Sequence, residues 1–304
     1  MKRIFLFLVT NLAAVATLSL VTAVVCSFCG VDVSQLGAEG GYAPLLLMAF
    51  LMGMAGSVVS LLMSKTMARA SVKARPIDGS EGDTERWLVA TVADLAGKAG
   101  LKTPEVAVYH GEPNAFATGA FKNSALVAVS DGILAKMSKE ELRAVLGHEM
   151  SHVANGDMVT MALTQGVINT FVIFFAHVIA GVVQGALSGG KNARRSRGGY
   201  GLYHVIVQVC QLVFGLFASV VLMWYSRRRE FAADAGSAAL LGSPGPMISA
   251  LRRLGGLEPG ALPDSMKAFG IAGRPSALAS LFASHPPLEA RIAALSGMPP
   301  PYAA

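Results

Sequence analysis

Charged residues are scarce in this sequence of 304 residues: Asp, Glu, Lys and Arg together make up 14%. This is about half the fraction that is usual in soluble globular domains. Hydrophobic residues account for 53%, and they gather in long runs instead of alternating with polar residues. The shortage of charge and the clustering of apolar residues argue against an ordinary soluble protein and predict membrane segments.

Cysteine is also rare, with three residues in the chain. Cys26 and Cys29 have CxxC spacing, but a structural zinc site of that type needs a second pair, which the sequence lacks. We interpret them as small apolar helix residues, with a redox pair as the alternative. No RNA-binding or zinc-finger spacing is present, so the net charge of +6 indicates contact with an anionic membrane face and no nucleic-acid partner.

Four long runs contain no Asp, Glu, Lys or Arg: residues 4–31, 40–64, 158–190 and 198–226. The first is too long for the core of a signal peptide and predicts an uncleaved transmembrane helix. Positive residues flank the outer ends of the first two runs, and the link between them carries acidic ones. The positive-inside rule therefore places the N-terminus and the chain from residue 65 onward in the cytoplasm.

The third and fourth runs are joined by a basic link that contains Lys191, Arg194, Arg195 and Arg197. If both runs span, this link lies outside, against the charge rule; a re-entrant or surface-lying hairpin is the alternative. Either arrangement returns the chain to the side that it left. We therefore expect an N-terminal transmembrane hairpin (1–64), a first cytoplasmic catalytic part (65–157), a second hydrophobic hairpin (158–226) and a second catalytic part (227–304).

The part at 65–157 predicts a helix over 85–100, extended segments at 104–109, 114–119 and 125–129, and a second helix after Ser138. Ser138 and Glu141 have the spacing of a capping box, and Asn155-Gly156 is a natural helix end. A small sheet thus precedes the second helix.

This second helix carries His148-Glu149-Met150-Ser151-His152. Two histidines four residues apart lie on one helical face, one turn apart, which allows both imidazoles to reach one metal ion. Glu149 is rotated by about 100° from His148 and can act on a bound water without ligating the metal. The alternative is a surface helix that carries two histidines by chance.

A catalytic zinc ion needs a third protein ligand and an open position. Glu230 and Asp234 follow the fourth apolar run and share a helical face, so one of them can bind metal while the other hydrogen-bonds a ligating imidazole. The alternative is an exposed helix start in which two acids balance three arginines. The hairpin at 158–226 favours the metal site, because it returns Glu230 to the side of His152.

The sequence resembles the HtpX-type membrane metalloproteases, relatives of the eukaryotic prenyl-protein endopeptidases. The resemblance covers nearly the whole chain and is carried by several motifs in order: Asn114-Ala-Phe-Ala-Thr-Gly119, Val127-Ala-Val-Ser-Asp-Gly-Ile-Leu134, Ala144-Val-Leu-Gly-His-Glu-Met-Ser-His152, Arg229-Glu-Phe-Ala-Ala-Asp234 and Ser284-His-Pro-Pro-Leu-Glu-Ala-Arg291.

This resemblance implies an α-rich α+β integral membrane protein with a zincin-like domain and a small β-sheet. It implies one Zn²⁺ per chain, held by His148, His152 and Glu230, with Glu149 assisting attack of a zinc-bound water on the peptide bond. The implied setting is the bacterial inner membrane, with the site facing the cytoplasm. The implied substrates are damaged or misfolded membrane proteins and unfolded polypeptides, cleaved in quality control and stress response.

Three further residues are assigned with an alternative for each. His285 either donates to the oxyanion of the tetrahedral intermediate or makes a turn before two prolines. Arg291 either organises this region or is a solvated helix residue. Asn114 either starts an edge strand that pairs with an extended substrate or makes a turn after Pro113.

Two other function classes remain as hypotheses. A scaffold with a structural zinc ion would need a fourth protein ligand to close the tetrahedron. A metal transporter would need ligands inside the apolar runs, where His177 and His204 are the available histidines.

Overall fold

The structure is a computed structural model, and it describes residues 42–187, 197–256 and 285–297. The apolar run at 4–31, Cys26 and Cys29, and most of the basic link at 191–197 lie outside the described residues. The chain divides into two compact units: Met1–Val59 with Ala162–Leu222, and Ser60–Met161 with Met223–Ala304. We describe each unit by itself.

Three described helices are long and apolar enough to cross a membrane: α2 (Tyr42–Ser71), α6 (Asp157–Leu187) and α7 (Arg197–Leu241). Their most apolar segments have mean hydropathies of 2.3, 2.1 and 2.4. No proline interrupts α6 or α7, and Pro44 falls in the first turn of α2, where a missing N–H is harmless. These helices and the small sheet described below confirm the predicted α-rich membrane fold class.

Close helix packing characterises the first unit. A Cβ atom on Gly53 of α2 would lie 2.6 Å from the backbone nitrogen of Thr170 in α6, so only glycine allows this approach. Small and branched residues, Ala176, Ala180 and Val207, join α6 to α7 in a buried cluster. Small residues at such contacts let helix backbones come close together in lipid.

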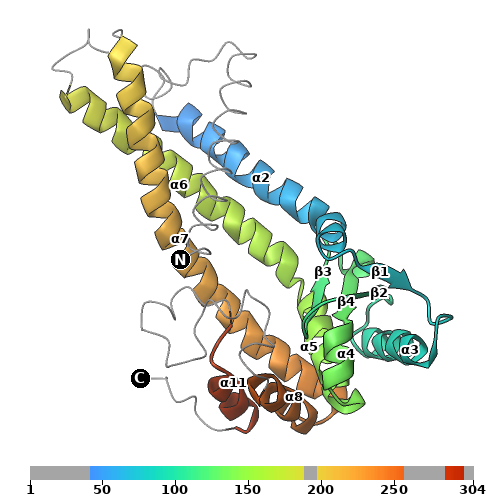
Figure 1. The fold of residues 1–304 in the computed structure, drawn as a ribbon. Helices are drawn as coiled ribbons and strands as arrows, with labels where there is room; N and C mark the ends of the chain where they lie inside the picture. The colour runs from blue at the N-terminus through green and yellow to red at the C-terminus, as the bar shows by residue number, and fades with distance from the viewer. Residues whose placement is uncertain (1–41, 188–196, 257–284, 298–304) are drawn as a thin grey trace. The chain divides into compact units, whose positions relative to one another are not determined.

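The second unit contains a sheet of four strands: β1 (Arg75–Ile77), β2 (Glu105–Tyr109), β3 (Ala115–Thr118) and β4 (Leu126–Ser130) (Figure 1). The order is β1-β2-β4-β3, with β2 and β4 parallel and the other two pairs antiparallel. All three segments that the sequence predicts to be extended form strands, and β1 is a fourth strand that the sequence did not predict. β3 therefore lies at an edge of the sheet.

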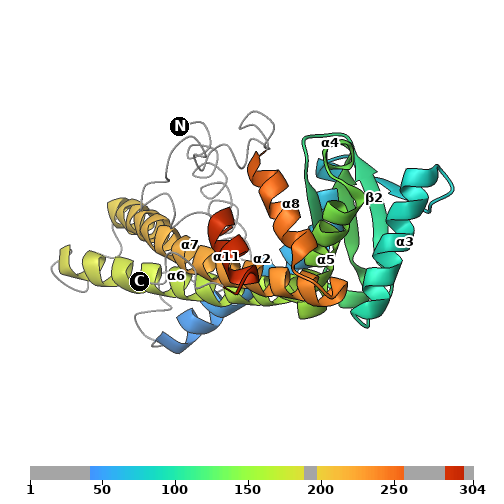
Figure 2. The ribbon, with the colours of Figure 1, turned by 90° about the horizontal axis from the view of Figure 1, so that it is seen from below.

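Side chains alternate between the two faces of these strands. One face carries Val106, Val127 and Ala117, and it forms the main core with α3 (Asp83–Lys98), α5 (Lys139–Asn155) and α8 (Gly245–Gly256) (Figure 2). The other face carries a smaller cluster around Ala107 and Leu126. The core thus places α5 directly against β3 and β4.

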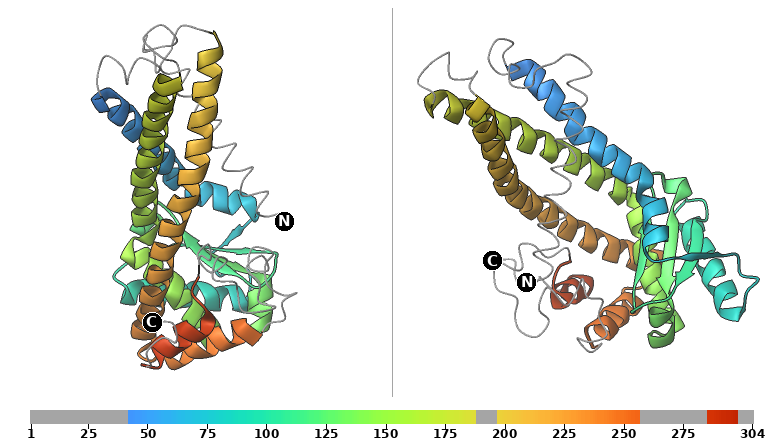
Figure 3. Two further views of the ribbon diagram at one scale, coloured as in Figure 1. Left: turned by 90° about the vertical axis from the view of Figure 1, so that its left-hand side faces the viewer. Right: turned by 45° about the horizontal axis from the view of Figure 1, so that its top comes forward.

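Helix α5 begins and ends as the sequence predicts. Ser138 accepts a hydrogen bond from the backbone of Glu141, whose carboxylate accepts one from the backbone of Ser138. Gly156 ends the helix in the left-handed conformation, with φ of 71°. Three short helices complete the described part of this unit: η1 (Lys122–Ser124), α4 (Asp131–Lys136) and α11 (Leu288–Leu295), the last packed on α8 (Figure 3).

Candidate metal centre

Three potential metal ligands meet inside the second unit. The side chains of His148 and His152 on α5 and Glu230 on α7 each offer one ligand atom, and these atoms all lie within 4.8 Å of one another. All three residues are buried. Glu230 reaches them because α7 continues without a break past Ser226, the last residue of the fourth apolar run.

The two imidazoles are oriented by carboxylates on their outer nitrogens. Nδ1 of His148 lies 2.9 Å from Oδ1 of Asp234, and Nδ1 of His152 lies 2.6 Å from Oδ2 of Asp157. The Nε2 atoms are 3.1 Å apart and face Glu230 at 3.6 and 3.3 Å. Such carboxylate contacts fix the ring orientation and make the inner nitrogen a better ligand.

Each of these aspartates is in turn held by an arginine. Arg291 donates from Nε to Oδ2 of Asp234 at 2.7 Å and from Nη2 to Oδ1 at 2.6 Å. Arg229 donates from Nε to Oδ1 of Asp157 at 2.7 Å. The buried Arg291 is therefore no solvated helix residue. The sequence alone does not predict that Asp157 and Arg229 support His152. The available signal for Asp157 is its position just past the helix end, five residues after His152.

The electrostatics of the cluster favour a cation. Four carboxylates, those of Glu149, Asp157, Glu230 and Asp234, surround the two histidines, against the two guanidinium groups of Arg229 and Arg291. With neutral histidines, this leaves two negative charges in a buried region. A divalent cation would neutralise them, so the donor set and its charge fit zinc.

The same carboxylates also raise the pKa values of both histidines. Burial alone would lower the pKa of His152, but its hydrogen bonds with Asp157 and Glu230 raise the pKa to about 10. Burial would likewise lower the pKa of His148, whereas Asp234 and Glu230 raise it above the ordinary value. Metal binding must therefore displace protons from both rings.

Glu149 lies beside this cluster and contacts the edge strand. Its Oε2 accepts a hydrogen bond from the backbone N–H of Ala117 in β3 at 2.8 Å. Burial raises the pKa of Glu149, although His148 and His152 partly oppose that effect. A carboxylate with a raised pKa is suited to take up and return a proton near neutral pH.

The remaining expected site residues fall close to this cluster. Nδ1 of His285 lies 2.7 Å from Oε2 of Glu230, and the His285 side chain is 51% exposed. Asn114 immediately precedes β3, with its backbone N–H and C=O both hydrogen-bonded to Ser130. The segment after Asn114 is therefore an extended edge strand and not a turn.

Residues 42–187, 197–256 and 285–297 are the ranges in which metal-binding groups can be compared. Within these ranges, His148, His152 and Glu230 form the one group of three or more such side chains close enough to share an ion. In the first unit, Nδ1 of His177 lies 2.8 Å from the carbonyl oxygen of Ile173, and its ring contacts Tyr203. This is a packing arrangement.

Comparison with known proteins gives consistent matches. "Protease HtpX homolog" of Herminiimonas arsenicoxydans is 54% identical over 98% of this chain and 100% of its own length, and the Bordetella petrii protein of that name is 52% identical over 98% and 99%. The crystal structure of S. mikatae Ste24p, at 16% identity, has a TM-score of 0.57 over 97% of this chain and 65% of that one, which shows a shared fold. Residues 83–299 match the sequence model of peptidase family M48, and this match together with the relatives above shows that the chain belongs to that family.

Proposed function

We propose that this protein is a zinc-dependent endopeptidase in which His148, His152 and Glu230 hold the metal and Glu149 is the catalytic acid and base. The observation that carries the proposal is the convergence of these three donors within 4.8 Å, with Glu149 one residue along the helix. These three protein ligands leave the fourth coordination position of a zinc ion open for water or substrate. A structural site would use a fourth protein ligand instead.

The carboxylates around the histidines support a ligand role over a packing role. Asp234 and Asp157 occupy both Nδ1 atoms, so each ring presents Nε2 to the space that Glu230 faces. A zinc ion there would act as a Lewis acid toward the scissile carbonyl and the attacking water. Arg291 and Arg229 hold the two aspartates in position. The aspartates in turn keep the imidazole rings in place, and the Nε2 atom of each ring stays available to bind the metal.

Glu149 provides the proton transfers. Its carboxylate takes a proton from the attacking water and returns a proton to the amine that leaves when the peptide bond breaks. We assign to His285, whose Nδ1 lies 2.7 Å from Oε2 of Glu230, the role of stabilising negative charge on the carbonyl oxygen.

The edge strand β3 supports binding of an extended substrate. Ala117 donates its N–H to Glu149 and not to β4, so this group lies on the open side of the strand. A peptide that adds to this edge gains hydrogen bonds from its backbone alone, which makes binding tolerant of sequence. Such tolerance suits the proposed role, quality control of damaged or misfolded membrane proteins under stress, and relatives named "Protease HtpX homolog" support the protease activity itself.

The proposed catalytic role of Glu149 is tested with Glu149→Gln in the full chain, purified in detergent and loaded with zinc. We expect zinc content to be unchanged and cleavage of an unfolded membrane protein or casein to fall at least about 100-fold, because proton transfer is lost. Zinc is measured by elemental analysis and cleavage by gel and mass spectrometry. The matched control is Glu140→Gln, an exposed glutamate at the start of the same helix, which should leave both quantities unaltered. Undiminished cleavage by Glu149→Gln would refute the mechanism.

A further inference from the structure

An exposed phenylalanine lies in the turn between β3 and β4. Phe121 is 66% exposed. Within the part of the chain that the structure describes, every other exposed large apolar side chain belongs to α2, α6 or α7, the three helices that are apolar enough to cross a membrane. On those helices lipid explains the exposure, because it replaces water as the solvent of their outer surface. Phe121 has the same exposure without belonging to such a helix, and it therefore needs its own explanation.

Local contacts fix Phe121 at the tip of this turn. Gly119 has a φ of 149°, and a Cβ atom there would lie 2.9 Å from a backbone atom across the turn, so the turn needs glycine. The backbone N–H of Ser124 donates to the carbonyl oxygen of Phe121 at 2.9 Å. The ammonium group of Lys122 donates to the carbonyl oxygen of Ala154, at the end of α5, at 2.5 Å. The turn is therefore held on both sides of Phe121, and the ring stays outside.

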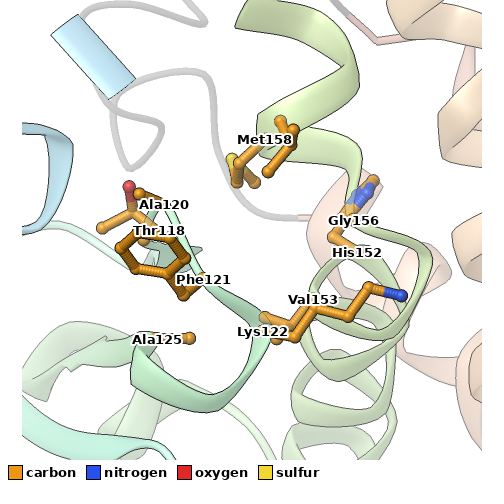
Figure 4. A pocket seen from close by; sticks show the side chains of 11 residues that line it. Thr118, Ala120, Phe121, Lys122, Ala125, His152, Val153, Gly156 and Met158 are labelled. Carbon is orange, nitrogen blue, oxygen red and sulfur yellow. The ribbon is translucent and has the colours of Figure 1, made fainter. Parts of the chain in front are cut away.

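The turn lies beside the first turn of α6. Phe121 and Met158 line the same cavity, which has a volume of about 20 Å³ and room for roughly one water molecule (Figure 4). The turn and the helix therefore almost touch at this point. Met158 is the first residue of the apolar run at 158–190, and Asp157 before it is charged. Because α6 changes from polar to apolar here, it enters the bilayer at the level of Phe121.

We propose that Phe121 inserts into the bilayer surface next to α6, which makes the turn after β3 a lipid contact of the second unit. The exposure of the ring, its fixed position and the adjacent start of an apolar helix all favour lipid as the partner. The turn at 119–125 contains no Asp or Glu, so it does not repel the phosphate groups of lipids. Phenylalanine is one of the side chains that enter the boundary between head groups and acyl chains.

This contact places the edge strand at the membrane surface. Thr118, the last residue of β3, precedes Phe121 by three residues, which span at most about 10 Å. A peptide that pairs with β3 can then be the stretch that leaves the bilayer directly beside a spanning segment. This consequence for substrates rests on the endopeptidase function proposed above, whereas the lipid contact itself does not.

Quenching of fluorescence by lipid tests the contact without any need for activity. The full chain carries Phe121→Trp, its two native tryptophans, Trp87 and Trp224, are replaced by phenylalanine, and it is placed in phosphatidylcholine vesicles. With bromine on the acyl chains near the head groups, we expect the emission at position 121 to fall at least about twofold, because the ring lies within that layer. Ala90→Trp, at an exposed position of α3, is the matched control and should keep its emission. Equal emission at position 121 in brominated and ordinary lipid would overturn the proposal.

Cleavage measures the consequence for substrates. In the same vesicles, Phe121→Ser should cut a reconstituted membrane protein about threefold or more slowly than the wild type, because the edge strand is held less firmly at the surface where the substrate emerges. Cleavage of casein in detergent should not change. Phe121→Leu keeps an apolar side chain and should cut both substrates as the wild type does.

The two substrates separate a lipid contact from a substrate contact. An equal loss of casein cleavage in Phe121→Ser would show that Phe121 contacts the substrate, and it would overturn the lipid assignment. Absence of cleavage by the wild type, with either substrate, would overturn the proposed endopeptidase function instead. The quenching result would still decide the lipid contact in that case.

Discussion

His152 depends on a carboxylate that is held in place by a residue from a distant part of the chain. Its Nδ1 contacts Asp157 at the start of α6, and Asp157 is held by Arg229 of α7, 72 residues later. His148 has an equivalent pair in Asp234 and Arg291. Both histidines thus have the same sequence of partners, imidazole, carboxylate and guanidinium, although the residues come from different helices.

We expect Asp157→Ala to weaken zinc binding by about 10- to 100-fold, because loss of a carboxylate behind a ligating imidazole has effects of this size. Competition with a chromophoric chelator measures the affinity. Asp83→Ala, an exposed aspartate on α3, is the matched control and should bind zinc as the wild type does. Glu230→Ala, which removes a proposed ligand, should lose zinc altogether. An Asp157→Ala protein with wild-type affinity would show that His152 needs no carboxylate partner.

The sequence predicts some contacts of this centre and not others. His148, Glu149 and His152 are adjacent on one helix, and Glu230 and Asp234 share a face of another, so helical spacing is sufficient to group each set. The Asp157–Arg229 pair has no such spacing, because it depends on where two helices meet. Arg229 also lies in a run of three arginines that resembles an ordinary basic flank of a membrane helix.

At the scale of elements, α5 carries two histidines, and its first turn determines where they lie. The carboxylate of Glu141 accepts from the backbone of Ser138 and also from the hydroxyl of Ser249 in α8, at 2.9 Å in both cases. Burial would raise the pKa of Glu141, but these hydrogen bonds lower it below the ordinary value. The capping box therefore both starts α5 and ties it to α8.

Ser138→Ala should destabilise the protein by about 1 kcal/mol, because the backbone N–H of Glu141 loses its acceptor. For a unit of this size, the thermal transition should fall by about 2–4 °C. Near-ultraviolet circular dichroism in detergent follows the transition. Ser138→Thr keeps the hydroxyl acceptor and should restore most of the loss. An unchanged transition in Ser138→Ala would mean that the cap contributes nothing to stability.

Elements with a strong local signal were predictable, and those without one were not. The cap, the apolar spacing and the terminal glycine define α5 from the sequence alone. β1 has three residues, one of them proline, and it is a strand because Arg75 and Ile77 pair with Val108 and Val106. Such a strand depends on a tertiary partner, so no periodicity could reveal it.

At the scale of the whole molecule, the proposed ligands come from two parts of the sequence that are separated by α6 and most of α7. Residues of both parts belong to one compact unit, which also contains α3 and α8. We therefore predict that both parts lie on one side of the membrane. The basic residues that follow the second apolar run, among them Lys65 and Arg69, favour the cytoplasmic side.

This orientation can be tested with single cysteines introduced after replacing Cys26, Cys29 and Cys210 by serine. We expect Ala90→Cys on α3 and Arg252→Cys on α8, both exposed, to resist a membrane-impermeant maleimide in intact spheroplasts and to react after permeabilisation. A cysteine at Ser34, in the link between the first two apolar runs, should react in both states. Labelling of either Ala90→Cys or Arg252→Cys from outside would contradict a cytoplasmic site, and labelling of only one of the pair would contradict a metal centre built from both parts of the chain.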